Sequence, residues 1–168
     1  DTNIKLRLDS RKSEKIFNHE QIKTSFAKQK HKSAIGEIAK NNFIYSRFHI
    51  DPLIDNDIAN QIKQEWVENY FNGKRGDKMI TALKDNKPVG FLQLIISGEE
   101  LLIDLIGVDK SVQGKGVATD MIYYAMDNIK HSFMKVGTQI GNIPSIKLYQ
   151  KLGFCISASE YIFHYHSK

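Results

Sequence analysis

The sequence predicts a mixed α/β domain whose sheet is mostly antiparallel. Residues 78–100 alternate with period two around two turn signals, 85–88 and 97–100, which is typical of consecutive antiparallel strands. Residues 101–138 then run from an apolar strand through a glycine-rich turn and a helix to another apolar strand. The right-handed crossover rule makes these last two strands, Leu101–Val108 and Phe133–Thr138, parallel neighbours.

Length and composition favour one domain with its own core. The chain has 168 residues, of which 41% are hydrophobic and 26% charged. No apolar run approaches the length of a membrane span and no leader pattern is visible, so we expect a cytoplasmic protein without membrane contact. The single Cys155 excludes an internal disulfide, and no Cys/His pair has zinc-ligand spacing, so no metal is expected.

Positive charge is concentrated near the N-terminus. The formal net charge is +5. The basic residues of this region are Lys5, Arg7, Arg11, Lys12, Lys15, Lys23, Lys28, Lys30 and Lys32. Neither an aromatic ladder nor a helical basic face accompanies them, so nucleic acid is not the expected partner. A phosphate-bearing small molecule fits the charge.

The first elements are two short strands and a helix. Ile4, Leu6 and Leu8 alternate with polar residues, which predicts a strand at the very start of the sequence. The sequence has no initiator methionine. We expect residues 1–168 to form one domain. Residues 1–20 are then either the end of a preceding region of a longer chain or the beginning of a domain whose leader was removed. The first strand pairs with absent material or with this domain's own sheet edge.

Residues 11–20 have little pattern and predict a connection, whereas Gln21–Ala27 alternates weakly and predicts a strand. Ser33 is a candidate N-cap for a helix over Ala34–Asn42. Asp55 or Asn56 caps the next helix, which ends near residues 72–73. Its expected apolar stripe is Ile58, Ile62, Trp66 and Tyr70.

The irregular segment between these helices is rich in groups that recognise ligands. Arg47 and His49 can meet a phosphate or carboxylate, and Tyr45 and Phe48 can stack on a ring. The alternative is that the segment covers the core, and the sequence leaves both open.

The strand over Leu101–Val108 is almost continuously apolar, which predicts burial on both faces. Two glycines follow in Gln113-Gly114-Lys115-Gly116-Val117-Ala118, and they let a turn expose successive backbone N–H groups. The next helix is expected to bury Met121, Ile122, Ala125 and Ile129. Strand, turn and helix N-terminus together predict an anion site. Thr119 stands where a dinucleotide fingerprint needs glycine.

A final helix begins in the segment 141–145, with Pro144 suited to its first turn, and ends at Gly153. Its apolar side carries Ile146, Tyr149 and Leu152. Residues 154–165 alternate as one bent strand or a closing pair.

Two motifs carry a family resemblance. Gln113-x-x-Gly116-x-Ala118, directly after a buried strand, resembles the first signature of the GNAT superfamily of N-acetyltransferases. The segment Asn142-x-x-Ser145-x-x-Leu148-Tyr149-x-x-Leu152-Gly153-Phe154 is similar to the second GNAT signature. The resemblance covers residues 78–165 and implies the GNAT fold, with a central splayed parallel strand pair and about four helices.

The resemblance implies acetyl-CoA as the acetyl donor, with its pyrophosphate on the loop amides and its pantetheine arm along Ile106-Gly107-Val108. The implied cofactor-binding residues are Ile106, Gly107, Val108, Gln113, Gly114, Lys115, Gly116, Val117, Ala118, Thr119 and Asn142.

Four short segments also look like those of bacterial acetyltransferases that modify TDP-4-amino-4,6-dideoxygalactose (TDP-fucosamine). The segments are 46–48, 65–69, 138–142 and 158–161. We therefore expect a TDP- or UDP-linked amino sugar as acceptor, with Arg47 and His49 near its phosphates. The alternatives are a polyamine, a drug or a protein amine, which would need Glu65, Glu68 and Asp51 to face inward. A non-catalytic acyl-CoA-binding module and a homodimer also stay open.

Two residues are candidates for proton transfer. Tyr149 occupies the family's acid position, and its alternative is a core tyrosine. Asp104, the sole acid in the apolar strand and expected on the face of Val108, is the candidate base. It can instead be a satisfied structural carboxylate or a ligand of an acceptor hydroxyl, and His49 is a second candidate base.

Overall fold

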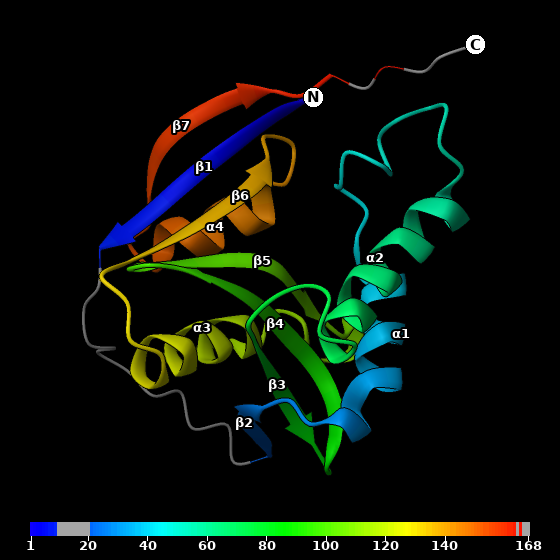
Figure 1. Ribbon diagram of the computed structural model, residues 1–168. Coiled ribbons are helices and arrows are strands. Elements are labelled where there is room, and N and C mark those ends of the chain that lie inside the picture. The colour runs from blue at the N-terminus through cyan, green and yellow to red at the C-terminus, as the bar shows by residue number, and fades with distance from the viewer. Residues whose placement is uncertain (10–20, 164, 166–168) are drawn as a thin grey trace.

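The computed structural model describes residues 1–9, 21–163 and 165, so the expected connection over 11–20 lies outside the described residues (Figure 1). The described strands are β1 (Thr2–Asp9), β2 (Ile22–Phe26), β3 (Lys78–Lys84), β4 (Lys87–Ser97), β5 (Glu100–Val108), β6 (Phe133–Gln139) and β7 (Cys155–Tyr161). The helices are α1 (Lys32–Asn42), α2 (Asn56–Phe71), α3 (Val117–Asn128) and α4 (Ile143–Lys151), with 3₁₀ turns at Gln29–His31 and Lys110–Val112. The order of α-helices and strands is the predicted one, and residues 155–161 form one strand.

The strands form one sheet in the order β2-β3-β4-β5-β6-β1-β7. Among the described strands, β5 and β6 are the one parallel pair, and all other neighbours are antiparallel. Helices α1 and α2 pack on one face, and α3 and α4 pack on the other (Figure 1). The predicted fold class is therefore confirmed. None of the helices in the described part of the chain has the length and apolar character needed to cross a membrane.

Strand β1 lies inside the sheet, between two strands from the far end of the chain. Leu6 pairs with Val136 of β6 on one side and with Ile156 of β7 on the other. The expected pairing with absent material or with the sheet edge was wrong, because β1 fills a gap between β6 and β7. Ile4, Leu6 and Leu8 are buried as the alternation predicted.

Strand β5 carries a β-bulge at Asp104. Gln93 of β4 pairs with Leu105 and the next residue, Leu94, pairs with Ile103, so Asp104 has no partner on β4. Expected burial on both faces was wrong, because buried residues alternate with half-buried ones along the strand. A bulge inserts one residue and so reverses which face the following side chains take.

The bulge places Asp104 on the face opposite Val108, which corrects the expected arrangement. Ile103 and Val108 both pack with the cluster under α3, although they are five residues apart. Leu105 belongs to the cluster under α1 and α2. Asp104 lies on that second face, where it bonds to Gln93. Counting residues along an unbroken strand could not reveal this reversal.

The expected start of α1 and the expected buried face of α2 also needed correction. Helix α1 begins at Lys32 after a 3₁₀ turn and its N-cap is His31, so Ser33 lies inside its first turn. Asp55 caps α2 as predicted, by accepting from Asp57 N. The buried face of α2 is one residue further along than the expected stripe: it consists of Ala59, Lys63 and Val67, and Ile58 is 53% exposed.

The hairpin between β3 and β4 is tighter than expected. Asp85 and Asn86 both take positive φ, at 50° and 63°, as a two-residue hairpin turn requires. Lys87 and Pro88, which were expected in the turn, are the first residues of β4.

Candidate active site

Strands β5 and β6 separate halfway along their length. Their pairing runs from Glu100 with Phe133 to Ile103 with Val136 and stops there. Beyond that point β5 stays paired with β4, and β6 stays paired with β1, so the two strands diverge (Figure 1). The bulge at Asp104 falls at the first residue after the last parallel pair. The expected splayed pair is present, and we call this opening the splay.

The backbone of β5 offers hydrogen-bonding groups to the splay. Asp109 N donates to Val89 O. Because backbone groups alternate in direction along an antiparallel pair, those of Gly107 face β4, and those of Ile106 and Val108 face the splay. The side chain of Gln113 donates from Nε2 to Val108 O at 2.9 Å. An extended ligand arm can therefore pair with the backbone of Ile106 and with Val108 N–H.

Gly107 is required by packing. A Cβ at this position would lie 2.7 Å from Phe91 Cε1, and Phe91 is fully buried in the cluster under α1 and α2. The glycine therefore leaves room for the Phe91 ring beneath β5, next to the splay.

The glycine-rich loop leads directly into α3. Gly114 and Gly116 have φ of 75° and 84°, a region that side chains other than glycine rarely adopt. Gly116 is the N-cap of α3, so the N–H groups of Val117, Ala118 and Thr119 belong to the helix's first turn and lack intrahelical partners. Exposed loop residues and a helix N-terminus therefore lie together at the position where the sequence predicts an anion site.

The loop is fixed at both ends. Asp109 caps the preceding 3₁₀ turn, and hydrogen bonds from the Ser111 hydroxyl and backbone lower the pKa of its carboxyl. Lys115 Nζ donates to Ser111 O at 3.1 Å. Gln113 Nε2 also donates to Asn42 Oδ1 at 3.1 Å, which links the loop to the end of α1. The loop therefore has a defined shape before any ligand arrives.

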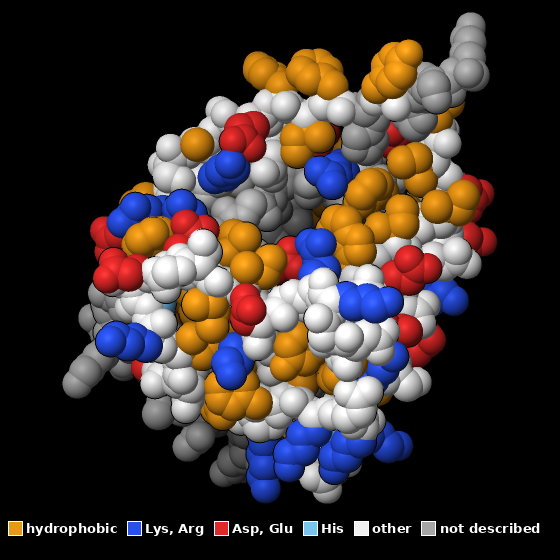
Figure 2. All heavy atoms as spheres, in the orientation of Figure 1, with side chains coloured by type: hydrophobic (Ala, Val, Ile, Leu, Met, Phe, Trp, Pro, Cys, Tyr) orange, Lys and Arg blue, Asp and Glu red, His pale blue; other side chains and the backbone are white. Residues whose placement is uncertain are grey.

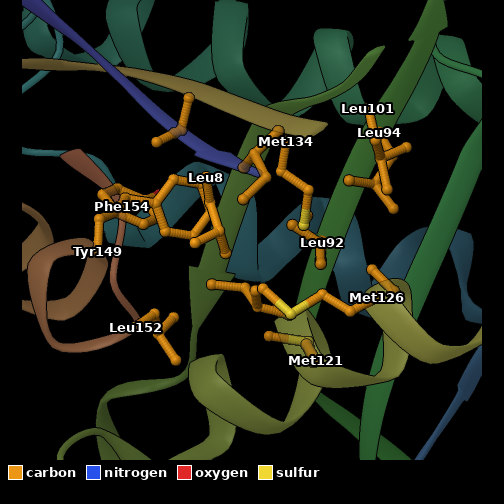
Figure 3. Close-up of a cluster of buried hydrophobic side chains, with 14 of the residues drawn as sticks. Leu8, Leu92, Leu94, Leu101, Met121, Met126, Met134, Tyr149, Leu152 and Phe154 are labelled. Atoms are coloured by element: carbon orange, nitrogen blue, oxygen red, sulfur yellow. The ribbon is translucent and has the colours of Figure 1, made fainter. Parts of the chain in front are cut away.

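Helix α4 begins at the carboxyl end of β6. Asn142 caps it by accepting from Ser145 N at 3.3 Å. Tyr149 is 2% exposed, and its ring centroid lies 5.5 Å from that of Phe154 (Figure 3). Burial raises the pKa of the Tyr149 phenol, so it stays protonated at neutral pH. The side chain lies in the core under α3 and α4, with its hydroxyl as the one polar group it carries.

Asp104 is held by three hydrogen bonds. Arg75 donates from Nε and Nη2 at 2.8 and 2.7 Å in a bidentate pair, and Gln93 donates from Nε2 at 2.8 Å. The Asp104 side chain is 10% exposed. Arg75 also stacks on Trp66, with 4.1 Å from its guanidinium carbon to the ring centroid. This arrangement favours the satisfied structural carboxylate among the alternatives for Asp104.

The segment between α1 and α2 is anchored by His49. The Ser46 hydroxyl lies 2.5 Å from its Nδ1, and Asn60 Oδ1 lies 2.9 Å from its Nε2. A ligand can use His49 only by breaking one of these contacts. Arg47 lies over the Phe48 ring at 4.9 Å. Its guanidinium has no acceptor among the described residues, so Arg47 is free to bind one.

Sequence reasoning missed three residues of this region: Lys63, Arg75 and Gln93. Arg75 lies in a surface-like stretch between Gly73 and Gly76, and its partner Asp104 is 29 residues away. Lys63 resembles any solvated lysine of a helix. The one available signal was the spacing of Ala59, Lys63 and Val67, which places the lysine on an otherwise small apolar face.

A splayed parallel pair beside a glycine-rich loop and a helix N-terminus defines the class of α/β acyltransferase domains that bind acyl-CoA. The model of the acetyltransferase (GNAT) family matches residues 42–154. The chain therefore belongs to the GNAT acetyltransferase family, and the predicted class of acetyl-CoA-dependent acyltransferase is confirmed at the level of the family.

A curated relative matches most of this chain. The spore coat polysaccharide biosynthesis protein SpsD of Bacillus subtilis (strain 168) is 34% identical over 134 residues, which cover 78% of this chain and 46% of that protein. The chain thus spans less than half the length of this curated relative.

Solved structures share the fold at low sequence identity. A functionally unknown conserved protein from Staphylococcus epidermidis has a TM-score of 0.67 at 16% identity, covering 94% of this chain and 58% of that one. The PaiA N-acetyltransferase of Thermoplasma acidophilum, solved in complex with coenzyme A, has a TM-score of 0.61 at 14% identity, covering 78% and 87%.

Proposed function

We propose that the chain transfers an acetyl group from acetyl-CoA to the primary amine of a nucleotide-linked amino sugar. The observation that carries this proposal is the splay, where the backbone of Ile106 and Val108 faces an opening next to the glycine-rich loop. Acetyl-CoA supplies the acetyl thioester. Its pyrophosphate suits the amides of Gly116, Val117 and Ala118, and its extended arm suits the edge of β5.

Tyr149 is the proposed proton donor to the departing thiolate. A phenol whose pKa is raised by burial keeps its proton at neutral pH, as an acid requires. The position of Tyr149 on α4, about two turns from the N-cap Asn142, brings it to the side of the sheet that carries α3.

Asp104 is proposed to position Arg75 and Gln93, because its oxygens already accept three hydrogen bonds. The amine then loses its proton to water before it attacks the thioester. This role differs from the expected general base, and it follows from how few lone pairs the carboxylate has left.

A sugar acceptor is supported by the curated relative, which is named for spore coat polysaccharide biosynthesis. Arg47 supports the nucleotide part of the proposal, because its guanidinium is half-buried and unpaired among the described residues. Guanidinium groups bind phosphate oxygens in a bidentate manner.

A thiol-release assay tests the proposal. The chain is supplied with acetyl-CoA and either a TDP- or UDP-linked 4-amino sugar, spermidine, an aminoglycoside or a peptide. Selective turnover of the nucleotide-linked sugar is the expected result. Selective turnover of one of the others would refute the sugar, and tight acetyl-CoA binding without turnover of any amine would indicate a binding module.

A further inference from the structure

Helix α2 buries a lysine beneath the segment that precedes it. Lys63 is 6% exposed and belongs to the buried face of α2. Its ammonium lies 4.3, 5.1 and 5.6 Å from the ring centroids of Trp66, Phe43 and Phe48. Fully buried lysines are rare unless an acceptor pairs with them. Within the part of the chain that the structure describes, Lys63 Nζ has no such acceptor.

The groups around Lys63 are mostly cationic. Arg47 approaches from the segment before α2 and Arg75 from the segment after it, and Asp104 on β5 is the one carboxylate of the described residues that acts on the lysine. Both Asp104 oxygens are already bonded to Arg75. Of the three cations, therefore, only Arg75 is hydrogen-bonded to a carboxylate among the described residues, and Lys63 and Arg47 are not.

The charge imbalance affects the lysine itself. Desolvation by burial lowers the pKa of Lys63 to about 8, and repulsion by Arg47 and Arg75 adds to this, whereas Asp104 opposes it. An anion that came to rest beside Lys63 and Arg47 would reverse these effects, because it would supply the missing acceptor.

The cluster lies next to the splay. Asp104, which fixes Arg75, is the bulged residue at which β5 leaves β6. Figure 2 shows this face of the molecule hollowed between the part that carries β1, β6 and β7 and the part that carries α1 and α2. Basic, acidic and hydrophobic side chains surround the hollow. The cluster therefore sits beside the opening that the acceptor would enter.

We propose that Lys63 and Arg47 form a phosphate-binding subsite for the acceptor, walled by Phe43, Phe48 and Trp66. The inference rests on the proposed nucleotide-linked acceptor and replaces His49, whose ring nitrogens are engaged, as the second phosphate ligand. Three cations and one carboxylate leave two positive charges, which match a diphosphate. Lys63 takes up a proton when the phosphate binds.

Calorimetry with TDP, which carries no amine or sugar, tests this subsite without catalysis. Titrations at pH 8 in two buffers of different ionisation enthalpy should show uptake of about half a proton per TDP, because a group with a pKa near 8 is half protonated there. The TDP Kd should weaken about tenfold from pH 7 to pH 9. Binding without proton uptake would overturn the inference.

Matched variants identify the residue. Lys63→Met should abolish both the proton uptake and the pH dependence, and Lys74→Met, at an exposed lysine just beyond α2, should change neither. Arg47→Gln should weaken TDP at every pH and keep the proton uptake. Unchanged uptake in a folded Lys63→Met variant would refute the assignment to Lys63.

Two further titrations distinguish an acceptor phosphate site from a cofactor phosphate site. Saturating acetyl-CoA should leave the TDP Kd unchanged, and competition would show that the site belongs to the cofactor. Inorganic pyrophosphate should give the same proton uptake, and its failure to do so would refute phosphate as the recognised group. Proton-linked TDP binding without acetyl transfer would keep this subsite and remove the proposed activity, whereas turnover of a TDP-sugar independent of Lys63 would do the reverse.

Discussion

The two sides of the splay are built from different materials. The proposed cofactor side offers backbone groups: the edge of β5, a loop with two left-handed glycines and the first amides of α3. The proposed acceptor side consists of charged and aromatic side chains, which come from the segment before α2, from α2 itself, from the segment after it and from β5. A backbone site is contiguous in sequence, whereas a side-chain site is assembled from separate elements.

This difference teaches where each side is vulnerable. Backbone amides remain after most substitutions, so the cofactor side fails only where a side chain blocks the amides or a φ angle is lost. The acceptor side depends on buried charges, and removing one partner of such a pair leaves the other uncompensated. Substitutions on the two sides should therefore separate effects on binding from effects on stability.

The largest effect is expected from Arg75→Leu, which leaves Asp104 buried without its bidentate partner. Urea unfolding should show a loss of about 3 kcal/mol in the free energy of unfolding. Arg7→Leu is the matched control, because Arg7 also stacks on a ring, Phe133, and pairs with Asp9, but at the surface. It should cost about 1 kcal/mol or less. Equal losses would mean that the acceptor side does not depend on its buried pair.

Tyr149→Phe should lower kcat about 100-fold and leave the KM for acetyl-CoA unchanged, because it removes a proton donor and keeps the ring in its packing. Tyr124→Phe is the control, since Tyr124 packs on Phe26 with the same 5.5 Å centroid distance that joins Tyr149 to Phe154. Steady-state kinetics of both variants give the comparison. Full activity of Tyr149→Phe would leave it a core tyrosine.

Gly116→Val should raise the KM for acetyl-CoA at least about tenfold, or 1.4 kcal/mol, because a branched side chain disfavours its φ of 84° and obstructs the loop amides. Gly98→Val, at a positive-φ glycine in the β4–β5 turn, should lower stability and leave this KM unchanged. An unchanged KM in a folded Gly116→Val variant would place the anion elsewhere.

The smallest effect expected is a gain. In the folded state the pKa of Lys63 falls from 10.5 to about 8, so the protonated lysine costs stability below pH 8, and this cost fades as the pH rises from 8 towards 10.5. Lys63→Met should therefore be about 1 kcal/mol more stable than the parent at pH 7, with a smaller gain at pH 9.5. Chemical unfolding at both pH values measures it. A loss of stability at pH 7 would show that the aromatic rings compensate for the buried charge.

The sequence predicted the elements around the glycine-rich loop well, because their signals are local. Period-two alternation, paired glycines and a proline in the first turn of α4 each act within a few residues, so the element order and the loop followed from them. The same locality limited the account of the acceptor side. The bulge at Asp104 depends on how β4 and β5 pair, and it moved a candidate base to the other face of the sheet.

Lys63 shows the limit most clearly. A lysine in an otherwise polar helix predicts exposure, but tertiary contacts, among them Phe43 and Phe48 of the segment before α2, bury it. The helices α1 and α2 approach each other closely at Gly36, where a Cβ would lie 3.1 Å from Glu68 Oε1. Such a contact depends on tertiary structure, so no helical periodicity reports it.

The placement of β1 has a consequence for how the chain acquires its structure. Leu6 pairs with Val136 of β6 and Ile156 of β7, so β1 can pair only after these two later strands have been synthesised. Contacts so distant in sequence slow folding, because loop closure precedes any gain from pairing. Until β6 and β7 are available, β1 has two unpaired edges and a row of exposed apolar side chains. Such segments bind chaperones and are prone to aggregate. We expect refolding to be limited by insertion of β1 between β6 and β7.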